Sequence, residues 1–152
     1  MDTSHLASPA FADAYRAFQE KRGSLPIGIG HTHEQLTRAG VPEEYAVRAL
    51  RGYMVPATII QLWESGVTLD FVDAYLDGRQ ARREQTTADA ERLEIVIACN
   101  LLRDKGVQED YALSLLRTGG SPVKILMYWR DDIALEYAQQ LVAEEVAERN
   151  SR

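Results

Sequence analysis

The chain has 152 residues, one cysteine (Cys99) and a formal net charge of -6. Its hydrophobic and charged fractions, 45% and 26%, are typical of a globular chain that buries a core, and they argue against a disordered one. The acidic balance disfavours a surface built throughout for a phosphate backbone, and a single thiol excludes an intrachain disulfide.

Residues 1–6 lack the basic and apolar regions of a signal peptide. The longest apolar run, residues 93–102, is about half as long as a membrane-spanning helix requires. We therefore expect a cytoplasmic protein that forms a single domain over residues 1–152.

Hydrophobic periodicity, caps and turn residues predict an all-α chain of about nine helices without strands. Ser8 and Ser121 each precede a proline, as an N-cap precedes a first helical residue. Thr32 and Gln35 fit a capping box that follows a loop at 23–30. The predicted helices are 9–22, 32–39, 42–52, 56–65, 68–84, 88–105, 108–118, 122–131 and 133–149.

The sequence matches itself when it is shifted by 66 residues. Residues 40–76 and 106–142 are identical at 11 of 37 positions, which include Tyr45/Tyr111, Pro56/Pro122 and Trp63/Trp129. We therefore predict two tandem, internally duplicated helix-turn-helix repeats, packed as one helical domain. Its parts are an N-terminal half-unit and loop (8–31), repeat 1 (32–78), a polar linker (79–87) and repeat 2 (88–149).

A shorter pattern, Leu-x3-Gly-Val-x3-aromatic-x4-Leu, begins at Leu36, Leu62 and Leu102, and a degenerate copy begins at Tyr128. The glycine suits the left-handed residue that ends a helix, and Asp132 replaces it in the last copy, so we expect a less ideal turn there. Acidic residues then open the next helix, where its dipole favours them. The periodicity predicts that the aromatic residue faces the core. The equivalent repeat positions of Trp63 and Trp129 likewise indicate core packing.

Residues Ala39–Gly52 resemble the turn and recognition helix of the lactose-repressor family, at Ala39, Gly40, Val41, Arg48, Leu50 and Gly52. This resemblance implies a DNA-binding regulator, with Arg38, Arg48 and Arg51 as the residues that could form a basic face. Two departures oppose it. Leu36 stands where the family has a small residue, and Glu43 and Glu44 open the recognition helix, where carboxylates repel phosphates.

Over residues 36–142 the chain is similar to short helical repeats with a Gly-Val-x-x-Glu-[Tyr/Phe]-Ala signature, which occur in many bacterial and archaeal proteins. This resemblance implies an architecture and no activity, so no functional residue is carried over from it. Residues 25–30 also resemble the phosphate-binding hairpin of helix-hairpin-helix proteins, although an inserted residue breaks the spacing.

The remaining candidate residues predict no reactive site. His31, His33 and Glu34 are potential zinc ligands without a completing group elsewhere in the sequence. Cys99 lies on an apolar helical face, which favours a buried, inert thiol. Arg82 and Arg83, and likewise Glu144 and Glu145, are typical of solvated helix faces.

We therefore expect no metal, no cofactor, no membrane partner and no catalysis. The expected function is a binding or scaffolding module for a protein partner or for self-association, since stacked helices present extended surfaces. The alternatives are a helix-turn-helix DNA-binding regulator, although nucleic acid is the less favoured partner, and a small helical enzyme without a recognisable motif.

Overall fold

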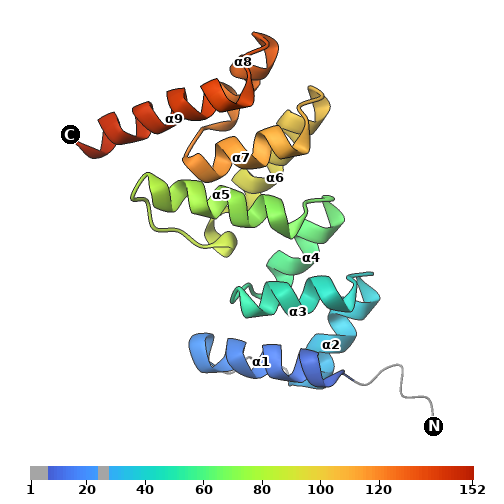
Figure 1. Cartoon of the computed structure of the whole chain (residues 1–152). Helices are drawn as coiled ribbons and strands as arrows, with labels where there is room; N and C mark the ends of the chain where they lie inside the picture. The colour runs from blue at the N-terminus through green and yellow to red at the C-terminus, as the bar shows by residue number, and fades with distance from the viewer. Residues whose placement is uncertain (1–6, 24–27) are drawn as a thin grey trace. The chain divides into compact units, whose positions relative to one another are not determined.

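A computed structural model describes residues 7–23 and 28–152, which form nine α-helices and no strand (Figure 1). The predicted all-α class is therefore confirmed. Of the segment 25–30, which resembles a helix-hairpin-helix hairpin, residues 25–27 lie outside the described residues. The helices are α1 (Pro9–Arg22), α2 (Ile29–Arg38), α3 (Glu43–Arg51), α4 (Pro56–Glu64), α5 (Leu69–Ala81), α6 (Ala88–Asp104), α7 (Glu109–Thr118), α8 (Pro122–Arg130) and α9 (Leu135–Asn150).

The chain divides into two compact units, unit 1 (Met1–Leu69) and unit 2 (Asp70–Arg152), and each is described by itself. In unit 1, α3 packs against α1 and α4 packs against α2. In unit 2, α7 packs against α9 and α8 packs against α6. Alternate helices therefore lie side by side within each unit. The single domain and its division at 79–87 stay predictions.

Serine and threonine side chains begin several helices. The backbone N–H of Phe11 donates to Ser8 Oγ at 3.1 Å, and that of Lys124 donates to Ser121 Oγ at 3.3 Å, so both predicted N-caps are confirmed. The capping box at Thr32 is wrong, because α2 already begins at Ile29 after Gly28. The Thr32 hydroxyl instead donates to the carbonyl of Gly28 at 3.1 Å, one helical turn back.

The four predicted turns share one backbone geometry. Their central residue has a positive φ, the conformation that favours glycine. The next residue then donates its N–H to the carbonyl five positions earlier, at 3.0 to 3.1 Å. The central residues are Gly40 (φ 83), Gly66 (φ 74), Gly106 (φ 76) and Asp132 (φ 56). The predicted left-handed helix ends at the three glycines are therefore confirmed, whereas the less ideal turn expected at Asp132 is wrong, because Asp132 adopts the same geometry.

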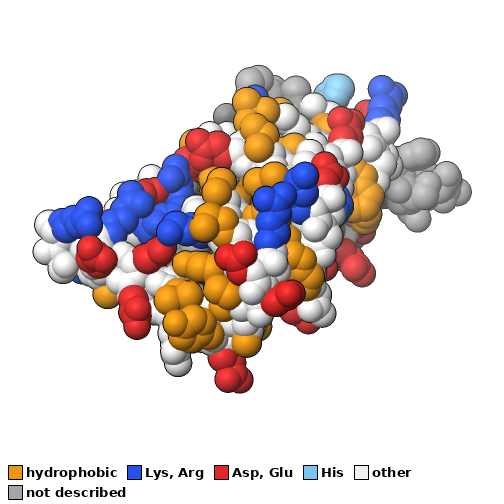
Figure 2. All heavy atoms as spheres, turned by 90° about the horizontal axis from the view of Figure 1, so that it is seen from above, with side chains coloured by type: hydrophobic (Ala, Val, Ile, Leu, Met, Phe, Trp, Pro, Cys, Tyr) orange, Lys and Arg blue, Asp and Glu red, His pale blue; other side chains and the backbone are white. Residues whose placement is uncertain are grey.

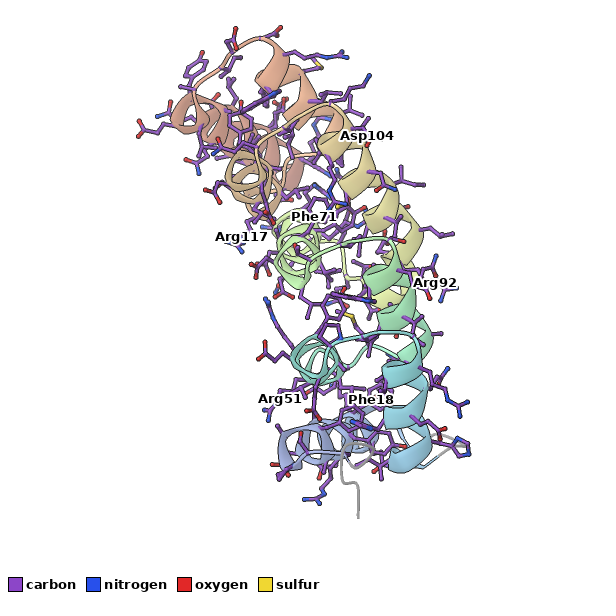
Figure 3. All side chains as sticks on the ribbon, turned by 90° about the vertical axis from the view of Figure 1, so that its right-hand side faces the viewer. Phe18, Arg51, Phe71, Arg92, Asp104 and Arg117 are labelled. Carbon is purple, nitrogen blue, oxygen red and sulfur yellow. The ribbon has the colours of Figure 1, made fainter. Side chains whose placement is uncertain are left out.

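The core consists of apolar side chains from the packed faces of the helices. In unit 1 they include Phe11, Phe18, Leu36, Leu50 and Leu62, all exposed by 2% or less. In Figure 3, Phe18 points between the helices, whereas Arg51 points outward from α3. Large apolar side chains also remain at the surface, and Figure 2 shows apolar patches among charged ones. No helix in the described ranges is long and apolar enough to cross a bilayer.

Candidate functional site

A tyrosine and a tryptophan form the side of a recess in unit 1. The Tyr45 hydroxyl on α3 donates to the carbonyl of Val67 at 2.8 Å, which ties α3 to the turn between α4 and α5. The Tyr45 ring meets Trp63 edge-on, with centroids 5.2 Å apart and an interplanar angle of 68°. Tyr45 is half-buried and Trp63 is 37% exposed. The predicted core position is therefore wrong in part, because one side of the pair faces solvent.

The recess beside this pair has a volume of about 690 Å³. Glu44 and Arg48 of α3 line it together with Glu64 at the end of α4, so charges of both signs surround the two rings. The backbone of the α4–α5 turn lines its remaining side. An apolar surface with a charged edge suits the binding of a partially apolar group.

The same pair of aromatic residues occurs in unit 2. The Tyr111 hydroxyl donates to the carbonyl of Ile133 at 2.8 Å, and its ring lies 5.0 Å from that of Trp129 at 69°. Tyr111 is more deeply buried, with 6% exposure, and its burial raises the pKa of its hydroxyl. The hydroxyl therefore remains a hydrogen-bond donor at neutral pH. The superposition of the whole repeats, 36–76 on 102–142, stays a prediction.

The three arginines of the DNA-binding alternative occupy different settings. Arg38 ends α2, and its guanidinium lies 2.6 Å from Glu34 Oε1. Arg48 lines the recess described above, and Arg51 ends α3 (Figure 3). Arg48 and Arg51 lie three positions apart and hence on the same side of α3, whereas Arg38 belongs to another helix.

Glu43, at the acidic start of α3, contacts residues outside its own helix. Glu43 Oε1 accepts a hydrogen bond from the backbone N–H of Ser8 at 3.3 Å and lies 3.7 Å from His33 Nε2. His33 is 8% exposed and its ring meets Phe11 edge-on at 4.8 Å. Glu43 thus connects α3 to residues at the start of α1 and on α2.

The residues considered for metal binding and nucleophilic chemistry do not converge. His31 is exposed while His33 is buried, and the described residues contain no group of three His, Cys, Asp or Glu placed to hold a metal ion. Cys99 is 4% exposed, and its burial raises the pKa of the thiol although Arg103 opposes this shift. The buried position predicted for Cys99 is confirmed.

A cluster of ion pairs forms where α5 ends in unit 2. Arg79 pairs with Glu84 and Glu91, and Glu84 also pairs with Arg149 of α9. The guanidinium of Arg82 donates to the carbonyl of Gly119 at 2.6 Å, and its side chain is only 15% exposed. The solvated setting predicted for Arg82 is therefore wrong, because it reaches residues 37 positions away, whereas Arg83 is exposed as predicted.

Two pKa values reflect this cluster. Hydrogen bonding with Glu94, and then with Arg79 and Thr86, lowers the pKa of Glu91 to about 2 against the opposing effect of burial. Burial and a 2.9 Å hydrogen bond to Glu94 raise the pKa of Tyr75 to about 12. Sequence reasoning missed this cluster. Its only signal was that the polar run 79–87 contains three arginines together with Glu84.

Comparison with known proteins gives no relative for this chain: no family model matches it, and neither a curated protein nor a solved structure is significantly similar.

Proposed function

We propose that this protein is a non-catalytic helical binding module that holds a protein partner through the recess beside Tyr45 and Trp63. The observation that carries the proposal is the 37% exposure of Trp63 within this recess. Tryptophan and tyrosine dominate many protein interfaces, because their large rings bury much apolar area with few rotatable bonds.

The two rings are already held in place before a partner arrives. The hydroxyl of Tyr45 is bonded to the α4–α5 turn, and its ring supports Trp63. Binding would therefore cost little side-chain entropy at this point.

The charges around the rings indicate the chemistry of the partner. Glu44 and Glu64 are acidic and Arg48 is basic, and all three line the recess. We infer a protein segment that inserts one apolar side chain beside Trp63 and carries charges of both signs around it. An apolar centre with a polar edge is the usual arrangement of a specific interface.

Affinity capture from a lysate of the source organism tests this proposal, with Trp63→Ala compared against Leu93→Ala. Leu93 is a matched control because it is an exposed apolar side chain (61%) outside the recess. We expect one or a few stoichiometric proteins on the wild type and on Leu93→Ala, and their loss on Trp63→Ala. Exposed Glu64 supplies a second variant, Glu64→Arg, which leaves the packed rings intact and should weaken capture.

Three outcomes would contradict the proposal. Equal capture by all variants would remove the recess from the interface. Capture that nuclease treatment abolishes would favour the DNA-binding alternative. A mass that rises with concentration in light scattering, and that Trp63→Ala lowers to the monomer, would make a second copy of the chain the partner.

A further inference from the structure

Unit 2 contains a second recess, of about 450 Å³, and most of the charged side chains in its lining are cationic. Four cationic side chains line it, against the two carboxylates of Glu84 and Glu145. They come from α5, the segment after it, α8 and α9, and are Arg79, Arg82, Lys124 and Arg149. Figure 2 shows basic side chains gathered toward the C-terminal end of α9. Within the lining cations outnumber carboxylates, although Arg79 also contacts Glu91 and Glu94, which lie outside the lining.

We propose that this recess binds a small oxyanion with two or more negative charges, such as a phosphate or diphosphate group. Guanidinium groups match the planar, multiple acceptors of a phosphate, and an ammonium group adds a point charge. The lining offers both kinds of cation from separate helices.

The start of α8 adds to the positive electrostatic potential in this recess. Ser121, which caps the helix, lies in the recess lining, so the positive end of the α8 dipole is directed toward the same space. Like α1, α2 and α4, α8 has no acidic residue in its first turn. No carboxylate of the first turn of α8 therefore competes with an anion at this end of the helix.

The cations are held close to one another by the fold. Arg82 is positioned by Gly119, and Arg79 and Arg149 both pair with Glu84. Burial, and then the charges of Arg79 and Arg149, lower the pKa of Arg82 against the opposing effect of Glu84. A bound anion would reduce this repulsion between like charges.

One pair in the recess can open to admit a ligand. Lys124 Nζ lies 2.9 Å from Glu145 Oε1, and both side chains are nearly half exposed, at 45% and 47%. Exposed ion pairs contribute little stability. Lys124 can therefore exchange Glu145 for a bound oxyanion, and Glu145 acts as the competitor of the ligand.

Isothermal titration with inorganic pyrophosphate and with orthophosphate, at constant ionic strength, tests the site. We expect saturable one-site binding that is tighter for pyrophosphate. Lys124→Gln should weaken it by about fivefold, the effect of losing one charge contact. Glu145→Gln should tighten binding by about twofold to fivefold, because it removes the competitor. The matched control is Lys105→Gln, an exposed lysine outside the recess, which should bind as the wild type does.

The gain of affinity in Glu145→Gln separates a ligand site from a purely structural ion-pair cluster. A structural role alone would give no saturable heat with the wild type. Identical binding by Lys124→Gln, Glu145→Gln and wild type would also overturn the proposal, since it would show a non-specific salt effect. Thermal melts without ligand confirm that the exposed substitutions leave the fold intact.

Discussion

The hydroxyl groups of Tyr45 and Tyr111 satisfy carbonyls that no helix can satisfy. Val67 and Ile133 each follow a residue with positive φ, at the point where one helix has ended and the next has not begun. Their carbonyls accept from the tyrosines at 2.8 Å. Each tyrosine thus joins a helix to a turn 22 residues further along the chain.

The two tyrosines should differ in their contribution to stability. We expect Tyr111→Ala to lower the free energy of unfolding by on the order of 3 kcal/mol, since it opens a cavity at a buried position. Tyr45→Ala should lower the free energy of unfolding by less, about 2 kcal/mol, because Tyr45 is only half-buried. Tyr→Phe at either position should cost about 1 kcal/mol for the lost hydrogen bond. Urea denaturation measures all four values, and a Tyr45→Ala variant as stable as the wild type would contradict this order.

Gly78 is a residue whose lack of a side chain the packing requires. A Cβ at this position would lie well inside van der Waals distance of the carbonyl oxygen of Leu116. Gly78 is inside α5, where alanine would otherwise be the better helix former. The close approach of α5 to the end of α7 therefore outweighs the intrinsic helical preference.

Substitution of Gly78 by alanine should show that the close approach of α5 to α7 matters more than the higher helix propensity of alanine. Gly78→Ala should lower the free energy of unfolding by about 3 kcal/mol, because backbone atoms must move apart. The matched control is Gly30→Ala in α2, where an added Cβ meets nothing within 4 Å, and it should stabilise by about 0.5 kcal/mol. Thermal and urea melts measure both changes, and a neutral Gly78→Ala would show that α5 and α7 can separate without cost.

At the scale of the elements, ion pairs and hydrogen bonds hold the connection that follows the end of α5. The helix ends at Ala81, and residues 82–87 connect it to α6. Arg79 and Glu91 join the two helices across this connection, with a 2.6 Å contact. Thr86 Oγ1 donates to the same carboxylate at 2.8 Å, so the connection is bonded to α6.

This cluster should make stability depend on pH at both ends of the scale. The pKa of Glu91 is lowered from 4.5 to about 2 in the fold. The contribution of this carboxylate to the free energy of unfolding is therefore present above pH 4.5 and is lost as pH falls toward 2. The pKa of Tyr75 is raised from 10.0 to about 12, so its contribution is present below pH 10 and is lost as pH rises toward 12.

The substitution Glu91→Gln tests the acidic window. It should lower the free energy of unfolding by about 2 kcal/mol at neutral pH, because Arg79 loses a charged acceptor. It should also flatten the decline of stability between pH 4.5 and 2. Denaturant melts across this range compare it with Glu136→Gln, an exposed carboxylate on α9. An acid decline of equal slope in Glu91→Gln and wild type would assign the transition to other carboxylates.

For the whole molecule, the distribution of charge affects how strongly the protein can bind nucleic acid. The chain is acidic overall, and Glu43 and Glu44 stand at the start of the helix that would enter a DNA groove. Arg48 and Arg51 lie further along the same helix. We therefore expect only weak duplex binding that disappears near physiological salt, since it would consist of phosphate contacts alone.

Fluorescence anisotropy with random-sequence and genomic duplexes, at low and near-physiological salt, measures this binding. Submicromolar affinity that persists at the higher salt, and that Arg48→Glu with Arg51→Glu abolishes, would replace the protein-binding proposal with a DNA-binding one. Arg16→Glu, an exposed arginine on α1 outside the two repeats, supplies a control for the change of charge.

The sequence by itself determined the helical class, most helix boundaries to within two residues, and the three left-handed turns at glycine, but it placed the end of α5 three residues beyond Ala81. These features depend on interactions between near neighbours, such as the N–H of Val41 bonded to the carbonyl of Leu36. Both partners of such a hydrogen bond lie within a few residues of each other in the sequence, so capping residues and glycine spacing predict these features. The start of α2 was predicted late, because a backbone glycine and not the Thr32 side chain precedes its first turn.

Only the tertiary structure decided which predicted faces are open and which polar residues are enclosed. Helical periodicity places Tyr45 and Trp63 toward neighbouring helices, but it does not say how far those neighbours extend, and the pair remains partly exposed. The polar run 79–87 suggested a solvated linker, yet Arg82 bonds to Gly119 and Glu84 to Arg149. These contacts join residues 37 and 65 positions apart, and chain topology brings them together where no local pattern records them.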